Sequence, residues 1–129
     1  MNHENFSMNI ILHAGNAKGY LHEALQDARN DDFEQVDAKI KQASNELLEA
    51  HKIQTQFLQD DAKEKVDSVS VILVHAQDHL MTVMSERDLI QEMIEMYRKQ
   101  HEMNQKLNQL MEGNSKKKLE QETWGTSED

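Results

Sequence analysis

Residues 69–97 have the sequence VSVILVHAQDHLMTVMSERDLIQEMIEMY, and this stretch decides the fold class. Its first six residues, 69–74, are rich in β-branched side chains, which in isolation favours a β-strand. The apolar pattern continues without a breaker as far as Ile94, however, and this is too long for a strand. The stretch therefore predicts a long helix whose early turns are apolar nearly all round, as in a helix covered on several sides.

Two amphipathic segments precede this helix. In the first, residues 8–28, apolar side chains recur at alternating steps of four and three, which predicts one buried helical stripe. Ser7 can cap the start of this helix, and the polar residues 30–32 break the pattern. The second segment begins at Phe33 with the same spacing, and the charged stretch 59–67 lacks periodicity, so it is predicted to be the connection to the third helix.

These segments predict an all-α fold, an antiparallel three-helix bundle in a single domain. The length of 129 residues, the absence of proline and an aromatic content of 5% agree with this fold class. We expect residues 1–7 to be an N-terminal tail, residues 8–100 to form the three-helix domain, and residues 101–129 to be a frayed helix end followed by a disordered polar tail. A small, alanine-lined bundle buries limited apolar area, so self-association is expected.

Charge and cysteine content exclude several functions. The formal net charge is -10, which repels nucleic acid and anionic lipid and favours a protein partner with a basic face. There is no cysteine, which excludes disulfides and thiolate metal ligands. No secretory leader and no apolar run of membrane-spanning length are found, so we expect a cytoplasmic protein without membrane insertion.

The third helix carries an unusual cluster of polar side chains. Helical spacing puts His75, Asp78 and Thr82 on one face, with His79 beside them. Because the surrounding turns are apolar, we expect these groups to be buried and to need partners. Such a dense cluster is therefore a candidate functional site.

Three hypotheses fit the spacing of this cluster. The first is a polar layer that only fixes the packing register of a helical adaptor, and the second is zinc binding by His75 and His79, which lie at positions i and i+4. The third is nucleophilic chemistry, in which a neutral imidazole accepts a phosphoryl group and His79, Gln77 or Thr82 supports it. Spacing alone does not choose among them.

Three separated motifs resemble those of the lactose/cellobiose enzyme IIA family of the bacterial sugar phosphotransferase system. The stretch VHAQDHLMT at residues 74–82 resembles the active-site signature of the family. Residues 13–17 (HAGNA) resemble its first-helix glycine motif, and residues 49–55 (EAHKIQT) resemble its second-helix motif. The resemblance covers about residues 10–97 without large gaps.

The resemblance implies a phosphocarrier that forms a homotrimer of three-helix protomers. His75 would take a phosphoryl group on Nε2 from the histidine phosphocarrier protein and pass it to a cysteine of the IIB component during sugar uptake. His79, Gln77 and His51 would be nearby site or interface residues. Asp78 of each copy would converge on the threefold axis around a shared divalent cation such as Mg²⁺, which relieves the repulsion between carboxylates.

Two details refine the resemblance. Members of the family tend to have a Ser-Gly pair before the third helix, where this chain has Lys63-Glu64, so the turn there is expected to differ. Ala76 within the signature is more similar to the cellobiose/chitobiose branch than to the lactose branch. Neither detail changes the residues expected to carry phosphate.

Overall fold

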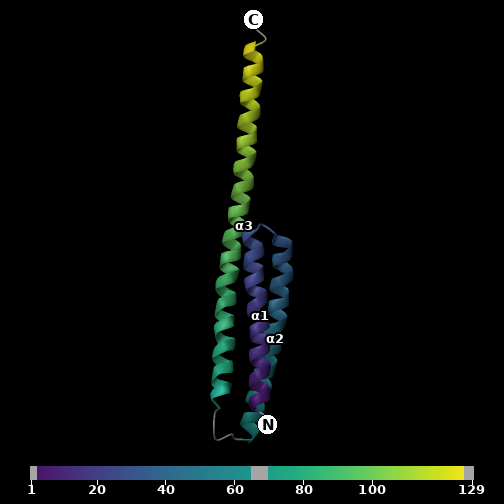
Figure 1. Cartoon of the computed structure of the whole chain (residues 1–129), viewed down its shortest axis with the longest axis vertical. Helices are drawn as coiled ribbons and strands as arrows, with labels where there is room; N and C mark the ends of the chain where they lie inside the picture. Colours follow the sequence, from purple (N-terminus) through teal and green to yellow (C-terminus); the bar gives the residue numbers. More distant parts are fainter. Residues whose placement is uncertain (1–2, 65–69, 127–129) are drawn as a thin grey trace.

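The computed structural model describes residues 3–64 and 70–126, and this part of the chain forms three α-helices. They are α1 (His3–Arg29), α2 (Phe33–Glu64) and α3 (Val71–Thr126). Helices adjacent in sequence run in opposite directions, and α3 extends far beyond the other two (Figure 1). The predicted all-α antiparallel bundle is confirmed, including the helical state of the β-branched start of α3.

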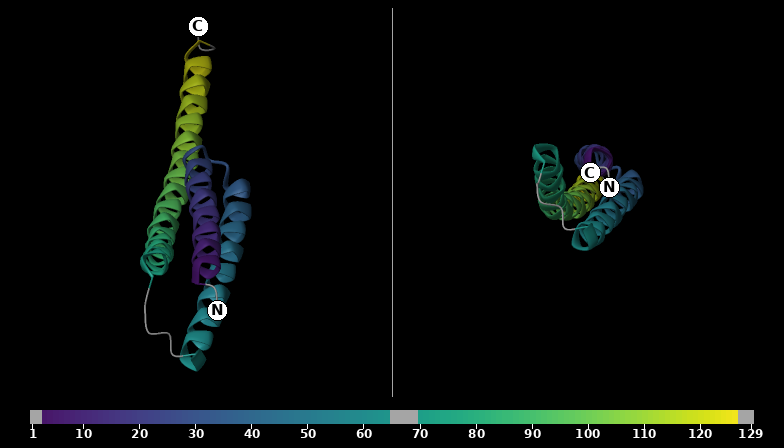
Figure 2. Two further views of the ribbon diagram at one scale, coloured as in Figure 1. Left: turned by 60° about the horizontal axis from the view of Figure 1, so that its bottom comes forward. Right: turned by 90° about the horizontal axis from the view of Figure 1, so that it is seen from below.

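α1 lies at the centre of the bundle. It packs along both α2 and α3, whereas α2 and α3 scarcely contact each other (Figure 2). The predicted stripe of α1 is fully buried and consists of Ile10, Ala14, Ala17, Leu21, Ala24 and Ala28. Because α3 packs mainly on α1, the opposite face of α3 is left uncovered in a single copy.

The partner helices present their own stripes to α1. The buried apolar residues of α2 are Val36, Ala43, Leu47, Ala50 and Phe57. Those of α3 are Leu73, Ala76, Leu80, Val83, Ile90 and Ile94. In both helices the spacing of these residues is that of one helical face, so the core follows directly from the sequence pattern.

The polar residues 30–32, which were predicted to break the pattern of the first helix, form a tight turn after α1. Asp31 adopts a left-handed conformation with φ of 62°, which reverses the chain. The Asp32 N–H donates to the Asp27 carbonyl at 2.9 Å, and the Asp31 N–H donates to the Ala28 carbonyl at 3.1 Å. This pair of bonds is the Schellman arrangement, which satisfies the last carbonyls of α1.

Side chains of α3 hold this turn where α3 leaves the bundle. The Arg98 guanidinium lies 5.0 Å from the centre of the Phe33 ring, and its Nη2 donates to Asp37 Oδ1 at 2.8 Å. His101 Nδ1 lies 3.3 Å from Asp31 Oδ1, and its ring is 5.4 Å from Phe33. The start of α2 is thereby attached to the middle of α3.

The predicted N-terminal tail is wrong for residues 3–7, because α1 already begins at His3. The rings of His3 and Phe6 pack edge-on against Phe57 of α2, at centroid distances of 5.1 and 5.7 Å. This contact explains the earlier start. Ser7 is therefore not a cap: it is buried inside α1, and its hydroxyl finds no hydrogen-bond partner among the described residues.

The predicted connection at 59–67 is also wrong for residues 59–64, because α2 continues to Glu64. Alanine, lysine and glutamate favour a helix, and Gln56 Nε2 donates to Asp60 Oδ1 one turn further on at 3.0 Å. The expected departure at Lys63-Glu64 thus lies in the last turn of α2. Residues 65–67 of the predicted connection, like Val69 at the predicted start of the third helix, lie outside the described residues.

The frayed and disordered tail predicted for 101–129 is wrong as far as Thr126, because α3 is helical up to that residue. Its last part is polar but consists mostly of good helix formers such as Lys, Gln, Glu, Leu and Met. Polarity predicted the exposure of this segment correctly and its backbone state incorrectly. Residues 127–129 lie outside the described residues.

Candidate functional site

The polar cluster lies in the first three turns of α3. The Ser70 hydroxyl accepts the backbone N–H of Leu73 at 3.2 Å and so caps the helix just before the cluster. His75, Asp78 and Thr82 share one face, as predicted, but all three are exposed. Their predicted burial is wrong for a single copy, because α1 covers only the opposite face of α3.

His75 and His79 form a stacked pair. Their ring centroids are 6.3 Å apart and the ring planes differ by 7°. His79 is half-buried whereas His75 is exposed, so the outer ring is accessible to another protein and the inner ring is held against the bundle. An imidazole beside an exposed imidazole is suited to donate a hydrogen bond to a group that the outer ring carries.

Gln77 is not beside His75 in the structure. Residues two positions apart point about 200° away from each other on an α-helix, so these two side chains lie on opposite flanks of α3. Gln77 is turned toward α2, where its side-chain carbonyl accepts a hydrogen bond from Gln54 Nε2. Within one copy, Gln77 therefore does not lie where it could support a group on His75.

Asp78 points away from the core. It is exposed, and it makes no hydrogen bond or ion pair within residues 3–64 and 70–126. Apolar side chains surround it on the same side of α3, including Val71, Val74 and Met81, which are 87%, 57% and 55% exposed. A carboxylate set among exposed apolar side chains is typical of a surface that another chain covers.

One copy does not provide a complete metal site. No group of three or more His, Asp or Glu side chains that could hold a metal ion occurs in the described part of the chain. The zinc hypothesis for His75 and His79 thus has no third ligand within that part. The carboxylate of Asp78 has the hard oxygen atoms that Mg²⁺ prefers, but a cation fits only where several copies bring this residue together.

His51 is exposed on α2, and no side-chain bond joins it to His75 or His79 within the described ranges. Its backbone carbonyl accepts the hydroxyl of Thr55 at 3.0 Å, one turn further along α2. The structure therefore does not bring His51 into the histidine pair. Gln54, three residues later, is the member of the second-helix motif that reaches α3.

The first-helix motif is attached to α2 through Glu46, a residue that the sequence analysis did not single out. His13 Nδ1 lies 2.5 Å from Glu46 Oε2, and both side chains are about three-quarters buried. Further along α1, Lys39 Nζ donates to Glu23 Oε2 at 2.5 Å, and this hydrogen bond raises the pKa of Lys39 above its ordinary value. Both pairs join α1 to α2.

Within the described ranges, no helix is both long and apolar enough to cross a lipid bilayer.

Comparison with known proteins supplies the family. Residues 5–98 match the family described as "PTS system, Lactose/Cellobiose specific IIA subunit". The N,N'-diacetylchitobiose-specific EIIA component of Escherichia coli K12 is 43% identical over 96 residues, which are 74% of this chain and 83% of that protein. All three predicted motifs fall inside the matched segment.

Solved structures agree with this match. The crystal structure of the cellobiose-specific enzyme IIA from Bacillus anthracis has a TM-score of 0.74 and 35% identity, covering 78% of this chain and 93% of that one. The IIA(Chitobiose) protein of Escherichia coli, solved in complex with HPr, has a TM-score of 0.70 and 40% identity, covering 78% and 98%. The part of α3 beyond residue 98 lies outside the family match.

Proposed function

Because the chain belongs to the lactose/cellobiose-specific IIA family of the sugar phosphotransferase system, we propose that His75 accepts a phosphoryl group from the histidine phosphocarrier protein and delivers it to the IIB component. The observation that carries the proposal is the exposure of His75 inside the family signature, beside the half-buried ring of His79. The protein works in the cytoplasm, where both partners are accessible.

The reaction is a pair of group transfers through His75. In the first, the N–P bond of the donor's phosphohistidine breaks as a bond forms from phosphorus to Nε2 of the neutral His75 ring. The proton of that ring stays on Nδ1, and the donor imidazole leaves with its electron pair. In the second, the Nε2–P bond breaks as a cysteine thiolate of the IIB component attacks phosphorus, which restores the neutral ring.

Exposure suits this chemistry. A phosphoryl group in a loose transition state needs its donor and acceptor in line, and little else from the protein except positioning and charge stabilisation. An exposed ring on a rigid helix permits a second protein to approach along that line. The net charge of -10 steers a donor with a basic face toward the chain.

His79 supports the phosphoryl group from within the same copy. Its ring stacks beside that of His75, and a ring N–H can reach a phosphoryl oxygen once the group is attached. Gln77 supports it from a neighbouring copy. In a cyclic assembly each copy presents one flank of α3 to the opposite flank of the next copy, so the Gln77 flank meets the His75 flank.

The assembly in this proposal is a homotrimer with Asp78 at its axis. Asp78 and its exposed apolar neighbours form the face of α3 that points away from α1, and a threefold contact along this face covers all of them. Three Asp78 carboxylates then meet, and they hold a divalent cation, which we take to be Mg²⁺. The cation supplies neutralising charge to the assembly and takes no part in the transfers.

The sugar belongs to the cellobiose/chitobiose type. Ala76 in the signature and the 43% identity to a diacetylchitobiose-specific protein support this choice over the lactose type. The branch can be identified by measuring phosphoryl transfer from the phosphorylated chain to IIB components of the cellobiose/chitobiose and lactose types. The IIB component that accepts phosphate at an appreciable rate shows which branch the chain serves.

The test is reconstitution from phosphoenolpyruvate and the two general phosphotransferase proteins. The wild-type chain is expected to acquire one acid-labile, base-stable phosphoryl group, and His75→Gln none. His79→Gln serves as the matched control, because it alters the neighbouring ring and is expected to slow labelling without abolishing it. Unlabelled wild-type chain of normal helicity would favour the helical adaptor, and stoichiometric zinc retained against mild chelation would favour the zinc protein.

A further inference from the structure

Beyond His101, which contacts Asp31 and Phe33, the part of α3 outside the family match is a helix without cover. We call residues 99–126 the extension; it projects past the turn between α1 and α2 as a single rod (Figure 1). From Glu102 to Thr123 every side chain is exposed. Most helices in proteins are stabilised by packing an apolar face rather than by propensity, and Gly113 in the middle weakens this one further. The extension therefore lacks the packing that normally sustains a helix.

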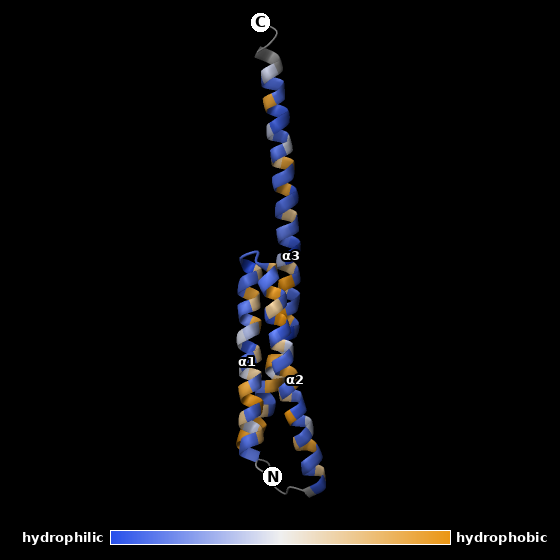
Figure 3. Ribbon diagram, turned by 90° about the vertical axis from the view of Figure 1, so that its right-hand side faces the viewer, coloured by the Kyte–Doolittle hydropathy of each residue, from blue (hydrophilic) through white to orange (hydrophobic). Residues whose placement is uncertain are grey.

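A line of exposed apolar side chains runs along α3 from the bundle into the first half of the extension. We call this line the stripe; it comprises Leu89, Met93, Met96, Met103, Leu107 and Leu110, with Gln100 at its centre. Successive members are separated by alternating steps of four and three residues, which is the a/d spacing of a coiled coil. All six apolar members are between 42% and 70% exposed, and Figure 3 shows isolated hydrophobic bands on the otherwise hydrophilic extension.

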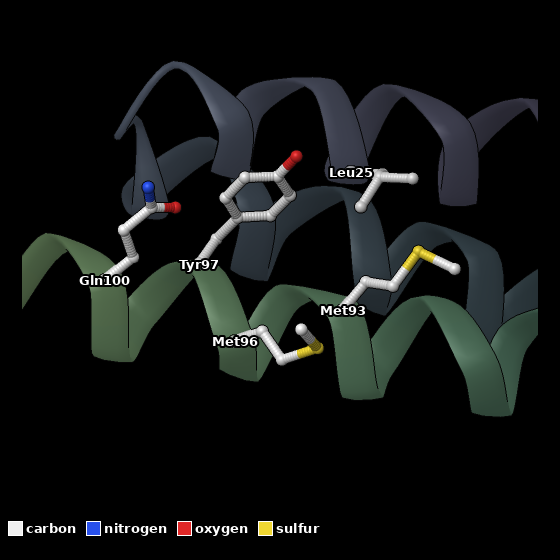
Figure 4. Close-up of a pocket in the computed structure, with 5 residues that line it drawn as sticks. All are labelled: Leu25, Met93, Met96, Tyr97 and Gln100. Carbon is white, nitrogen blue, oxygen red and sulfur yellow. The ribbon is translucent and has the colours of Figure 1, made fainter.

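The stripe begins on the bundle itself. Three of its residues, Met93, Met96 and Gln100, line an open, mainly apolar groove of about 440 Å³ together with Leu25 of α1 and Tyr97 of α3 (Figure 4). The groove and the extension thus share one line, apolar except for Gln100, which is about 30 Å long from Leu89 to Leu110 at the rise of an α-helix. A helix lying along this line covers both at once.

The charge of the extension favours other copies of this chain as the occupant. Five lysines and four glutamates give residues 99–126 a net charge near zero, whereas the whole chain carries -10. Extensions can therefore approach one another with little repulsion, although the bundles are acidic. Each copy brings the same stripe, and one polar residue at an a position, here Gln100, is a known device for fixing the register of a coiled coil.

We propose that the extensions of neighbouring copies pack against one another along the stripe as a parallel, in-register coiled coil. Its parallel orientation and its three strands rest on the trimer proposed above, since threefold symmetry makes all copies of α3 parallel. The coiled coil continues the self-association surface proposed around Asp78 along the same face of α3, because Leu89 lies eleven residues after Asp78. It ties together the ends of the copies that lie far from His75.

Cysteine cross-linking tests the contact directly, because the native chain has no cysteine. Met103→Cys and Leu110→Cys are each expected to form a disulfide between equivalent positions of two copies on mild oxidation. Leu119→Cys is the matched control: Leu119 is 64% exposed but lies off the stripe, so its variant is expected to stay monomeric on a denaturing gel. Disulfides at Met103→Cys alone would indicate antiparallel crossing and overturn the proposal, as would no disulfide at either stripe position.

A second measurement separates the coiled coil from the proposed phosphocarrier activity. Leu107→Glu/Leu110→Glu is expected to raise the dissociation constant of the assembly by at least about tenfold in sedimentation equilibrium. The control Asn108→Glu/Leu119→Glu adds the same charge off the stripe and is expected to assemble like wild type. Equal dissociation of the two variants would overturn the coiled coil.

Labelling of the same proteins reports on the other proposal. If the stripe variant assembles normally while His75 is still phosphorylated, the coiled coil is wrong and the phosphocarrier stands. If stripe disulfides form in a protein that is never phosphorylated, the coiled coil stands and the phosphocarrier is wrong. Stripe disulfides in an assembly of dimer mass would overturn the three-stranded form.

Discussion

The two parts of α3 are one continuous helix in two different surroundings. Up to Arg98, α3 buries one apolar face against α1 and exposes His75 and Asp78 on its other side. From Glu102 to Thr123, by contrast, every side chain is exposed. The first part is fixed by packing against its neighbours in the same chain. The second has an equally regular apolar line but no neighbour in the same chain to cover it, so its regularity indicates a partner outside the protomer.

The largest expected effect compares the same substitution in the two parts. Leu80 is 1% exposed in the core, so Leu80→Ala is expected to reduce the free energy of unfolding by about 2–5 kcal/mol. Leu119 is 64% exposed in the extension, and Leu119→Ala is expected to change it by no more than about 0.5 kcal/mol. Urea denaturation at equal protein concentration measures both. Similar losses for the two variants would contradict the division of α3 into packed and unpacked parts.

The next effect concerns Gln77, on the flank of α3 that we propose faces a neighbouring copy. Gln77→Ala is expected to slow phosphoryl acceptance by roughly 100-fold, since it removes one hydrogen-bond donor from the developing charge. Gln109→Ala, the same change in the extension, is the control and is expected to leave the rate unchanged. Rapid-quench labelling with a phosphorylated donor measures the rate.

Mixed assemblies sharpen this prediction. Copies carrying His75→Gln retain Gln77, and copies carrying Gln77→Ala retain His75. Mixing and reassembling the two should restore fast labelling at some sites, because a His75 then lies beside an intact Gln77 of another copy. If the mixture labels no faster than Gln77→Ala alone, Gln77 does not act between copies.

A smaller effect is expected at Asp78, whose carboxylate we propose lies at the trimer axis. In wild type, removing divalent cations with a chelator is expected to weaken assembly by about tenfold or more, because three carboxylates then repel one another. Asp78→Leu should assemble equally well with and without chelator. Asp88→Leu, another exposed aspartate of α3, should retain the wild-type response in sedimentation. Persistent cation dependence in Asp78→Leu would contradict the proposed role of this residue.

The smallest effect lies at the boundary between the two parts. Arg98→Ala removes both the contact with Phe33 and the ion pair with Asp37, and it is expected to destabilise the chain by about 1 kcal/mol or less because the ion pair is exposed. Thermal unfolding in low and high salt measures it, and salt should shrink the difference. Lys99→Ala is the control at the next position and should leave the melting temperature unaltered.

Periodicity predicted the faces of the helices well. The apolar residues of α1 from Ile10 to Ala28 that recur at steps of four and three are fully buried, as predicted. The residues of the polar cluster do share a face. Periodicity does not show, however, whether another helix covers a given face. His75 and Asp78 were predicted to be buried because their turns are apolar, yet in one copy these turns have no cover.

The remaining errors have local physical causes. Polar composition suggested a frayed helix end after residue 100 and disorder from Gly113 onward, although the same lysines, glutamines and glutamates are good helix formers. Gln77 was expected to support His75 as a possible hydrogen-bond donor and by the family resemblance, and a spacing of two residues leaves this role open only between copies. The pairing of Gln54 with Gln77 and of His13 with Glu46 depends on how helices dock, which no single helix encodes.

The central claim is that phosphate resides on one exposed ring. The most direct test is to phosphorylate the wild-type chain with phosphoenolpyruvate and the general phosphotransferase proteins and to locate phosphorus by NMR and fragment mass spectrometry. The account predicts a single phosphohistidine on Nε2 of His75, with the other six histidines unmodified. Phosphate on any other residue, or an unmodified His75 ring in a folded protein, would contradict it.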